Sequence, residues 1–509
     1  MARYKPIDMR PQLISVDFAR HILPGSCEYA LCYLMDHEMD LAEFDHRFCH
    51  DERGAPAYAP ALLRKIVLLA YARGLVSSRA LESACQQHVL FMAVCGGATP
   101  PFTPLAAFVR TGGEALCRLF TQGLMVCDRQ GLSGRQLFAS DGVKLPSNAS
   151  KARSGTRKEL PREAKKLDRA VRRMLARHRP EDLTHTCEPS LRARETRQVE
   201  RLKQEAQQIR TWLQRHPEDR RGVRGGSRQS NRTDHESAKM ATGKGVIQGD
   251  TGGAAVDETH PILGGAQAHG VGPEQELLVP VVEAVQAIRT EAPIIPADAG
   301  SQSEDNLKQL AEQGIDAYVP DNGSRKRDPH YRGQAKPRSN PAPLSHKGAE
   351  PANPRVFRSQ DFHPAGDHSY CGCPAGERRY RNGHHRDLRG FAALKFTGRK
   401  TACGRGPVRA RGLRDPDTTP VRQVAVRLGP TAGTPETHTA RMTRKIDSPT
   451  GKEMMTRRFA TVEPVVGNLR YNKRLYHFTL RGRTKVDGQW KLYCLVHNIE
   501  KLAHLGYAS

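Results

Sequence analysis

Three acidic residues far apart in the sequence have the chemistry to bind divalent metal ions together. They are Asp141, Asp298 and Glu463. Hard cations such as Mg²⁺ prefer oxygen ligands, usually one or two carboxylates with phosphate oxygens and water. Two such ions can activate an attacking oxygen and stabilise the leaving oxygen of a phosphodiester. Without metal, the clustered carboxylates would repel one another and raise some of their own pKa values.

The segments around the three acids predict the elements that position them. Residues 136–142 are typical of a strand ending in Asp141, and residues 293–300 of a strand ending in Asp298. Residues 452–470 predict a helix that carries Glu463. An aspartate at a strand end is weak evidence by itself, because such residues often cap helices or form turns. The order of the elements around all three acids is the stronger signal.

That order is the order of an RNase H-like α/β core. Between the two aspartates we expect two further strands and a helix, and after Asp298 a helix, a strand and the glutamate helix; the ranges are 245–256 (interrupted at Gly252-Gly253), 261–266, 273–289, 303–313 and 317–320. In such a core the first and fourth strands lie side by side. Both aspartates would therefore meet at one edge of the sheet, and the glutamate would reach them from a late helix.

The rest of the chain divides into a helical N-terminal region and two long insertions. The predicted segments are 1–130 (helical, DNA-binding), 131–150 (first strand), 151–232 (charged helical insertion), 233–322 (core continued), 323–450 (Pro/Gly/Arg-rich insertion without a clear core) and 451–509 (end of the core). The N-terminal helices fit a helix-turn-helix domain and a plain packing domain equally well. The first insertion predicts an antiparallel hairpin of two amphipathic helices, whose basic faces could simply be solvated.

The charge of the chain indicates a polyanionic partner. Its 509 residues contain 80 Lys+Arg and 54 Asp+Glu, a formal net charge of +26. Such a charge favours nucleic acid, because each neutralised phosphate releases condensed counterions. No apolar stretch is long enough to span a membrane and no signal peptide is evident. Most cysteines are scattered among apolar residues of predicted helices, which predicts reduced thiols and a cytoplasmic protein. With a DNA partner, we expect it to be associated with the nucleoid.

Four stretches carry a resemblance to a known family. They are LFASDGVKLPSNAS around Asp141, SNRTDHESAKMATGKGVIQG before the second strand, IIPADAGSQSEDNLKQLAEQGIDAYVPDN around Asp298 and RRFATVEPVVGNLRYNKRL around Glu463. The chain resembles bacterial insertion-sequence transposases of the DDE type, in a subgroup with a helical N-terminal domain and an insertion-rich RNase H-like catalytic domain. The resemblance covers most of the chain and is weakest in 323–450.

The resemblance implies both a metal site and DNA contacts. It makes Asp141, Asp298 and Glu463 the catalytic triad that holds Mg²⁺ or Mn²⁺, with two ions expected. It places four basic residues against DNA: Arg457, Arg458, Arg470 and Lys473. Arg470 stands where relatives commonly have a lysine, which is not equivalent. The implied partners are double-stranded DNA (terminal inverted repeats and target DNA) and a second copy of the chain, forming a homodimer on DNA.

Two departures from the family pattern leave alternatives open. Asp250-Thr251-Gly252-Gly253 stands where relatives have a Tyr-Asn pair followed by Gln, and its glycines predict a weakened central strand. Asp250 and Asp257 are rival carboxylates for the site. A catalytically impaired, DNA-binding remnant of a transposase is therefore the alternative function, and a structural or RNA-packaging basic protein is a third.

The second departure is a cysteine patch in the Arg-rich segment. Cys371, Cys373 and Cys403, with His384 or His385, could supply four zinc ligands. We do not expect zinc there, because Cys-x-Cys is tighter than the usual ligand spacing. In addition, glycines stand at 406 and 412, where relatives tend to have cysteine.

Overall fold

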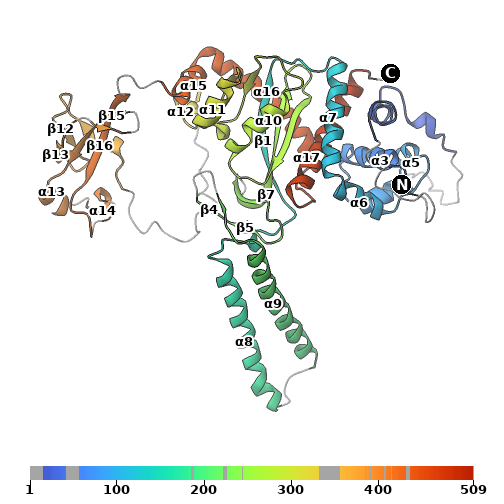
Figure 1. The fold of residues 1–509 in the computed structure, drawn as a ribbon, viewed down its shortest axis with the longest axis horizontal. Coiled ribbons are helices and arrows are strands. Elements are labelled where there is room, and N and C mark those ends of the chain that lie inside the picture. The colour runs from blue at the N-terminus through green and yellow to red at the C-terminus, as the bar shows by residue number, and fades with distance from the viewer. Residues whose placement is uncertain are drawn as a thin grey trace, which may run out of the picture. The chain divides into compact units, whose positions relative to one another are not determined.

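The computed structural model describes residues 15–41, 57–184, 189–221, 226–243, 245–331, 356–384, 386–388, 391–405, 409–413, 415, 417–430 and 436–507. The chain forms two compact units, one made of Met1–Leu344 and His438–Ser509, the other of Ser345–Thr437. Both contain helices and strands (Figure 1). Among the described residues, every helix is too short or too polar to span a lipid bilayer.

Two small sheets joined at one residue pair form the centre of the first unit. Strand β7 (Gly245–Asp257) pairs antiparallel with β1 (Phe138–Pro146), β6 (Ala238–Thr242) and β8 (Leu263–His269). Strand β9 (Ile294–Pro296) pairs parallel with β10 (Asp316–Tyr318). A parallel bridge between Leu137 and Ile294 joins the two sheets. The order β8-β7-β1-β9-β10 follows, and it confirms that the first and fourth strands of the predicted core are neighbours.

The glycine-rich segment is a regular part of the central strand. Strand β7 is continuous over Gly245–Asp257, so the predicted interruption at Gly252-Gly253 is wrong. A Cβ on Gly252 would lie 2.8 Å from the Trp490 ring, and one on Gly253 would lie 2.8 Å from Val281. The Trp490 indole also donates a hydrogen bond to the Gly253 carbonyl (2.9 Å). The two glycines therefore make room for close packing on the sheet, a role that composition alone does not reveal.

Helices from the later part of the chain pack around this sheet. They are α10 (Leu278–Ala284), α11 (Glu304–Glu312), α12 (Ser324–Arg327), α15 (His438–Asp447), α16 (Pro449–Gly467) and α17 (Arg483–His504). Helix α10 is shorter than the predicted 273–289, and a 3₁₀ turn at Glu274–Glu276 precedes it. Pro280 explains this start, because a proline without an N–H is tolerated only in the first helical turn.

The N-terminal helices share their core with the sheet. They are α1 (Cys27–Tyr33), α3 (Pro60–Ala72), α4 (Ser78–Gln87), α5 (Val89–Val94), α6 (Phe102–Thr111) and α7 (Gly113–Arg129). Helix α7 packs along α17 so closely that a Cβ on Gly123 would lie 2.4 Å from Leu495. One continuous apolar cluster runs from these helices into the sheet. The predicted boundary at residue 130 is thus not a boundary between compact units.

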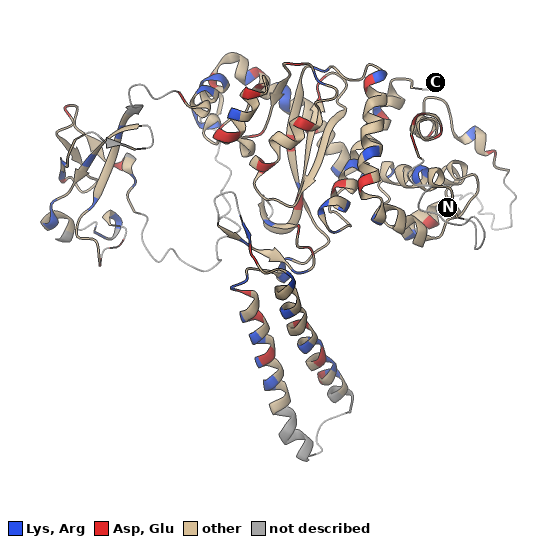
Figure 2. Ribbon diagram, in the orientation of Figure 1, with Lys and Arg blue, Asp and Glu red and all other residues tan. Residues whose placement is uncertain are grey.

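The first insertion is a pair of long helices that run side by side (Figure 1). They are α8 (Leu160–Thr184) and α9 (Pro189–Arg215), with the short strand pairs β2–β5 (Ser154–Gly155, Ser230–Asn231) and β3–β4 (Arg220–Arg221, Ser227–Arg228) beside them. Leu160, Ala164 and Ile209 form a small buried cluster between the helices. Figure 2 shows acidic residues interspersed with the basic ones along both helices.

The second unit is a small antiparallel sheet with its own core. Its strands are β11 (His363–Pro364), β12 (Tyr370–Gly372), β13 (Arg378–Arg381), β14 (Arg386–Asp387), β15 (Phe391–Thr397) and β16 (Gln423–Pro430), with helices α13 (Lys400–Arg405) and α14 (Arg409–Gly412). The expectation of no clear core is wrong here, since a buried cluster is present: Phe362, Cys371, Leu394, Phe396 and Val424. So few apolar residues barely alter the composition of an arginine-rich segment. Helices α12 and α15 belong to the first unit, so this unit is shorter than the predicted insertion of 323–450.

Candidate active site

Asp141 lies within β1, which continues to Pro146, so the predicted end of the strand at Asp141 is wrong. Asp141 forms an ion pair with Arg458 of α16. Arg458 Nη2 donates to Asp141 Oδ1 at 2.9 Å, and Arg458 Nε donates to the Ser140 carbonyl at 3.1 Å. The Arg458 side chain is only 2% exposed and that of Asp141 is 20% exposed. We expected Arg458 to face DNA, but in this structure its guanidinium is the buried partner of an acidic site residue.

The two other acids of the predicted triad act on Asp141 electrostatically. The pKa of Asp141 is raised to about 6, mainly by burial, and the carboxylates of Asp298 and Glu463 add to the rise. The Arg458 cation and the Gly142 N–H oppose it by stabilising the charged form. The fold therefore brings Asp298 and Glu463 close enough to affect the pKa of Asp141, although each acid is more than 150 residues from the next in the sequence.

Local structure explains where Asp298 and Glu463 lie. Asp298 follows β9 and is the N-cap of a 3₁₀ turn at Ala299–Ser301, where its Oδ2 accepts a hydrogen bond from Gly300 N (3.4 Å). Glu463 is an exposed residue of α16. That helix begins where Ser448 accepts a hydrogen bond from Gly451 N (3.1 Å), with Pro449 in its first turn.

The acids fit a hard divalent cation by donor type. All three offer carboxylate oxygens, and a cation would relieve the repulsion that Asp298 and Glu463 add to the effect of burial on Asp141. As the side chains stand, no group of three His, Cys, Asp or Glu residues in the described part of the chain is close enough to hold one ion. The positive charge that contacts Asp141 in this structure is the Arg458 guanidinium.

A groove beside Asp298 combines cationic and aromatic side chains. Its volume is about 760 Å³, and its walls include Arg325, Tyr331, Lys452 and Phe459 together with four aspartates, Asp298, Asp321, Asp328 and Asp447. Lys452 forms an ion pair with Asp328 (3.3 Å). The Arg325 guanidinium lies 5.7 Å from the Tyr331 ring centre and 5.9 Å from that of Phe459. Cations for phosphates and rings for bases suit a nucleic acid strand. We did not predict these residues, although Phe459 stands directly after two arginines and a phenylalanine on an exposed helix face is a usable signal.

The other basic residues expected at DNA are already engaged or partly buried. Arg457 forms an ion pair with Glu258 (Nε to Oε1, 2.6 Å), with both side chains partly exposed. Lys473 is 1% exposed and forms an ion pair with Glu500. Arg470 lies on the π-helical turn at Asn468–Asn472, and its buried Nε has no hydrogen-bond partner among the described residues. A phosphate would have to displace Glu500 to reach Lys473.

The rival carboxylates Asp250 and Asp257 lie elsewhere on the sheet. Asp141 stands opposite Ala254 on β7, so Asp250 is four residues away along the strand and Asp257 three residues away in the other direction. At about 3.3 Å per residue, both are on the order of 10 Å from that point. Asp257 instead accepts hydrogen bonds from Gly134 N (2.9 Å) and Thr259 N (2.8 Å), which makes it a turn-stabilising residue.

The cysteines of the expected patch lie in the second unit and face different surroundings. Cys371 is buried in the apolar core, whereas Cys373 and Cys403 line a cavity. His384 is in a turn, and His385 lies outside the described residues, as does Gly406. The ten cysteines that the structure describes are all free thiols.

Comparisons with known proteins match two segments of the chain. Residues 17–111 match the family described as Transposase domain (DUF772), and residues 372–503 match the family described as Transposase DDE domain. The second match includes Glu463 and much of the second unit, so it extends into the segment 323–450, where we expected the resemblance to be weakest. A DDE domain implies an RNase H-like core, in agreement with the observed strand order. Comparisons with curated proteins and with solved structures found no match.

Proposed function

The two matches indicate an insertion-sequence DDE transposase, and from this premise we propose that the protein binds the ends of a mobile DNA element and catalyses strand cleavage followed by strand transfer. The observation that carries the proposal is that Asp298 and Glu463 lie close enough to Asp141 to raise its pKa electrostatically. A net charge of +26 supports a DNA partner, and transposases in general bind DNA. Because an element has two ends, we expect a homodimer assembled on DNA.

The three acids would hold the divalent cations that DDE domains generally use, Mg²⁺ or Mn²⁺. When bound, such ions supply activation of the attacking oxygen and stabilisation of the leaving 3′ oxygen in an in-line displacement. The chain itself contributes a rigid strand under Asp141, a capped turn under Asp298 and a helix under Glu463. Fixed supports of this kind lower the barrier by positioning rather than by covalent chemistry.

Arg458 is a positioning residue in this proposal. Its two hydrogen bonds hold the Asp141 carboxylate against β1 and favour the ionised form, which is the form that binds metal. The groove beside Asp298 would hold the DNA strand, with Arg325 near a phosphate and Tyr331 and Phe459 stacked on bases. Lys452 is paired with Asp328 and would reach a phosphate only by leaving that carboxylate. Base–aromatic stacking tolerates any sequence, which suits a site that must also accept target DNA.

The observation that favoured the main alternative, a catalytically impaired remnant, is no longer present in the structure. That reading depended on a damaged central strand, and β7 is continuous with its glycines packed against Trp490 and Val281. The third candidate, a basic packaging protein, does not explain why Asp298 and Glu463 lie close enough to Asp141 to affect its pKa.

A cleavage assay tests the proposal. The full chain is incubated with Mg²⁺ or Mn²⁺ and a labelled duplex that carries the inverted repeats flanking the gene. Asp141→Asn, Asp298→Asn and Glu463→Gln should each abolish nicking while DNA binding, measured by mobility shift, persists. Asp250→Asn is the matched control and should cleave like the wild type. Nicking by Asp141→Asn at the wild-type rate would remove Asp141 from the mechanism.

A further inference from the structure

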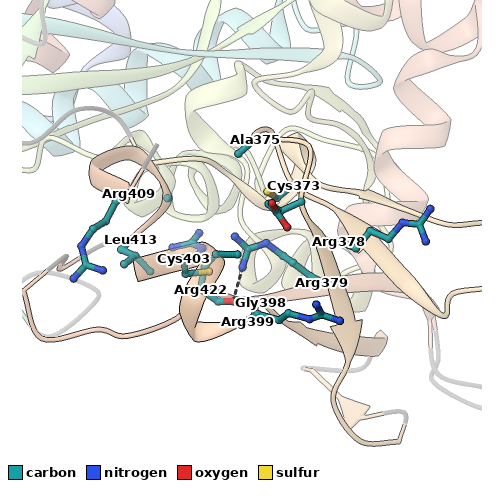
Figure 3. Close-up of a pocket in the computed structure, with 13 residues that line it drawn as sticks. Cys373, Ala375, Arg378, Arg379, Gly398, Arg399, Cys403, Arg409, Leu413 and Arg422 are labelled. Atoms are coloured by element: carbon teal, nitrogen blue, oxygen red, sulfur yellow. Dashed lines mark hydrogen bonds between the residues drawn. The ribbon is translucent and has the colours of Figure 1, made fainter. Parts of the chain in front are cut away.

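The second unit contains a small cavity that the proposed active site does not use. Its volume is about 100 Å³, and all of its lining residues lie between Cys373 and Arg422. Figure 3 shows the side chains that surround it, which come from the turn between β12 and β13, from β13, from the segment after β15, from the two short helices and from the residue before β16. The cavity therefore belongs to this unit alone.

The lining of the cavity is strongly cationic. It includes one carboxylate, Glu377, and five arginines, which are Arg378, Arg379, Arg399, Arg409 and Arg422. In the described part of the chain, the guanidinium groups of Arg378, Arg379, Arg399 and Arg422 form no ion pair with a carboxylate. Several stack on rings instead: Arg378 lies 4.6 Å from the Tyr370 ring centre and Arg399 lies 5.1 Å from that of Tyr380. Stacking orients these cations without neutralising them.

Two of these arginines have buried donors that lack an acceptor. Arg379 is 6% exposed; its Nη1 donates to the Arg422 carbonyl (2.7 Å), but its Nε has no partner among the described residues. Arg422 Nη2 donates to the Phe357 carbonyl (2.9 Å), and its Nε is likewise buried without an acceptor. Burial lowers the pKa of Arg422, and the neighbouring Arg379 cation lowers it further. Buried unsatisfied donors beside like charges are costly unless an anion is bound.

We propose that this cavity binds a phosphate group of the DNA backbone and makes the second unit an additional DNA-contacting part of the protein. The inference rests on the proposed function, because DNA is the polyanion that a transposase handles. Guanidinium groups match the geometry of phosphate oxygens by paired N–H donors. The exposed arginines Arg378 and Arg399 would steer the backbone to the cavity, where the buried Nε groups of Arg379 and Arg422 complete the contact.

A contact of this kind would raise affinity without reading sequence. Phosphate contacts fix the register and orientation of a protein on DNA, whereas base contacts specify the site. The second unit would then hold DNA of any sequence. Much of this unit falls inside the matched DDE segment, residues 372–503, which agrees with a role in the transposase reaction.

The salt dependence of DNA binding tests the inference. The full chain and three variants bind a fluorescent duplex of arbitrary sequence, and the dissociation constant is measured by anisotropy from low to moderate salt. Each lost phosphate contact should reduce the slope of log affinity against log salt by about 0.9. We expect that reduction, with roughly three- to tenfold weaker binding near 0.1 M salt, for Arg422→Gln and for the double variant Arg378→Gln/Arg399→Gln.

Arg427→Gln is the matched control. Arg427 is an exposed arginine of β16 that stacks on Phe391 at 4.9 Å and does not line the cavity, so its removal takes away the same charge from the same unit. Its slope should stay within about 0.3 of the wild-type slope, less than half of the loss expected for one phosphate contact. The rim double variant removes only exposed side chains and keeps the test valid if Arg422→Gln does not fold. An unchanged slope in the rim variant, or an equal change in Arg427→Gln, would overturn the inference.

Inorganic phosphate distinguishes a backbone site from a site for a free anion. If phosphate raises the thermal stability of the wild type but the cavity variants bind DNA with the wild-type slope, the cavity holds a free anion and the inference is wrong. The result is separable from the proposed function, because binding is measured without cleavage. A wild-type protein that binds with the expected slope but never nicks element ends would contradict only the catalytic proposal.

Discussion

Arginine has opposite surroundings in the two compact units. In the first unit Arg458 is buried and forms an ion pair with the Asp141 carboxylate, which neutralises its charge. In the second unit Arg379 is equally inaccessible but has another arginine, a ring and a carbonyl as neighbours. The same side chain type thus neutralises an aspartate in one unit and leaves a positive charge to be neutralised in the other. Burial by itself does not tell which role an arginine has; the sign of its neighbours does.

The largest effect in this comparison should come from Arg458→Met. Removing the cation leaves Asp141 partly buried without its partner, which should lower the free energy of unfolding by about 3–5 kcal/mol. Urea unfolding followed by circular dichroism measures the loss. Arg457→Met is the control, since the pair with Glu258 is partly exposed and worth about 1 kcal/mol or less. Equal losses in the two variants would show that the buried ion pair has no special weight.

Asp250→Asn extends the comparison to an acid that has no such partner. Burial and the nearby Asp234 raise the pKa of Asp250 to about 7, and its Oδ2 is buried without a hydrogen-bond partner among the described residues. Because the folded-state pKa lies above the unfolded value, the wild type gains stability below about pH 4 and loses it as pH rises through about 7. The variant, which does not titrate, should be more stable than the wild type by up to about 4 kcal/mol at pH 8.

The pH profile of the two proteins checks this sign. The difference in unfolding free energy should shrink steadily between pH 8 and pH 4. A constant difference across that range would mean that Asp250 is ionised in the folded protein at every pH, and that Arg220 neutralises it better than the raised pKa indicates.

Two glycine substitutions compare the packing of the central sheet in the first unit with that of the sheet in the second unit. Gly252→Ala in β7 forces a Cβ against the Trp490 ring and should cost about 1–3 kcal/mol of unfolding free energy. Gly372→Ala in β12 meets nothing closer than 3.6 Å and should change stability by about 0.5 kcal/mol or less. Hydrogen exchange, read separately over β7 and β12, locates each effect. Equal tolerance at both sites would contradict the close packing of Trp490 on the central strand.

The smallest effect should come from Arg379→Met. The substitution removes a hydrogen bond to the Arg422 carbonyl and a contact with the Phe362 ring, but it also removes a like charge and an unsatisfied donor. These contributions oppose one another, so stability of the second unit should change by about 1 kcal/mol or less. Hydrogen exchange over residues 356–430 measures it. A loss as large as that of Arg458→Met would mean that Arg379 is a structural residue and not part of a ligand site.

Much of the core was predictable because its signals are local. Runs of apolar residues before Asp141 and Asp298 mark strands, and residues 452–470 predict most of the helix that carries Glu463, which the structure places at Pro449–Gly467. The order of these elements was enough to place the first and fourth strands together. The sequence misled at Gly252-Gly253, because a glycine that accommodates a tryptophan from α17 looks the same in the sequence as one that weakens a strand.

The sequence by itself determined the positive charge, the order of strands and helices, and the three acids on these elements, since each depends on composition or on residues close together in the chain. Only the tertiary structure decided that Arg458 is the partner of Asp141, a contact across 317 residues. It also decided that four arginines of the second unit surround one cavity without a carboxylate partner among the described residues. The physical reason is that the period of the apolar residues indicates whether a segment forms a helix or a strand. The neighbours of a buried charge depend instead on which distant segments pack against it.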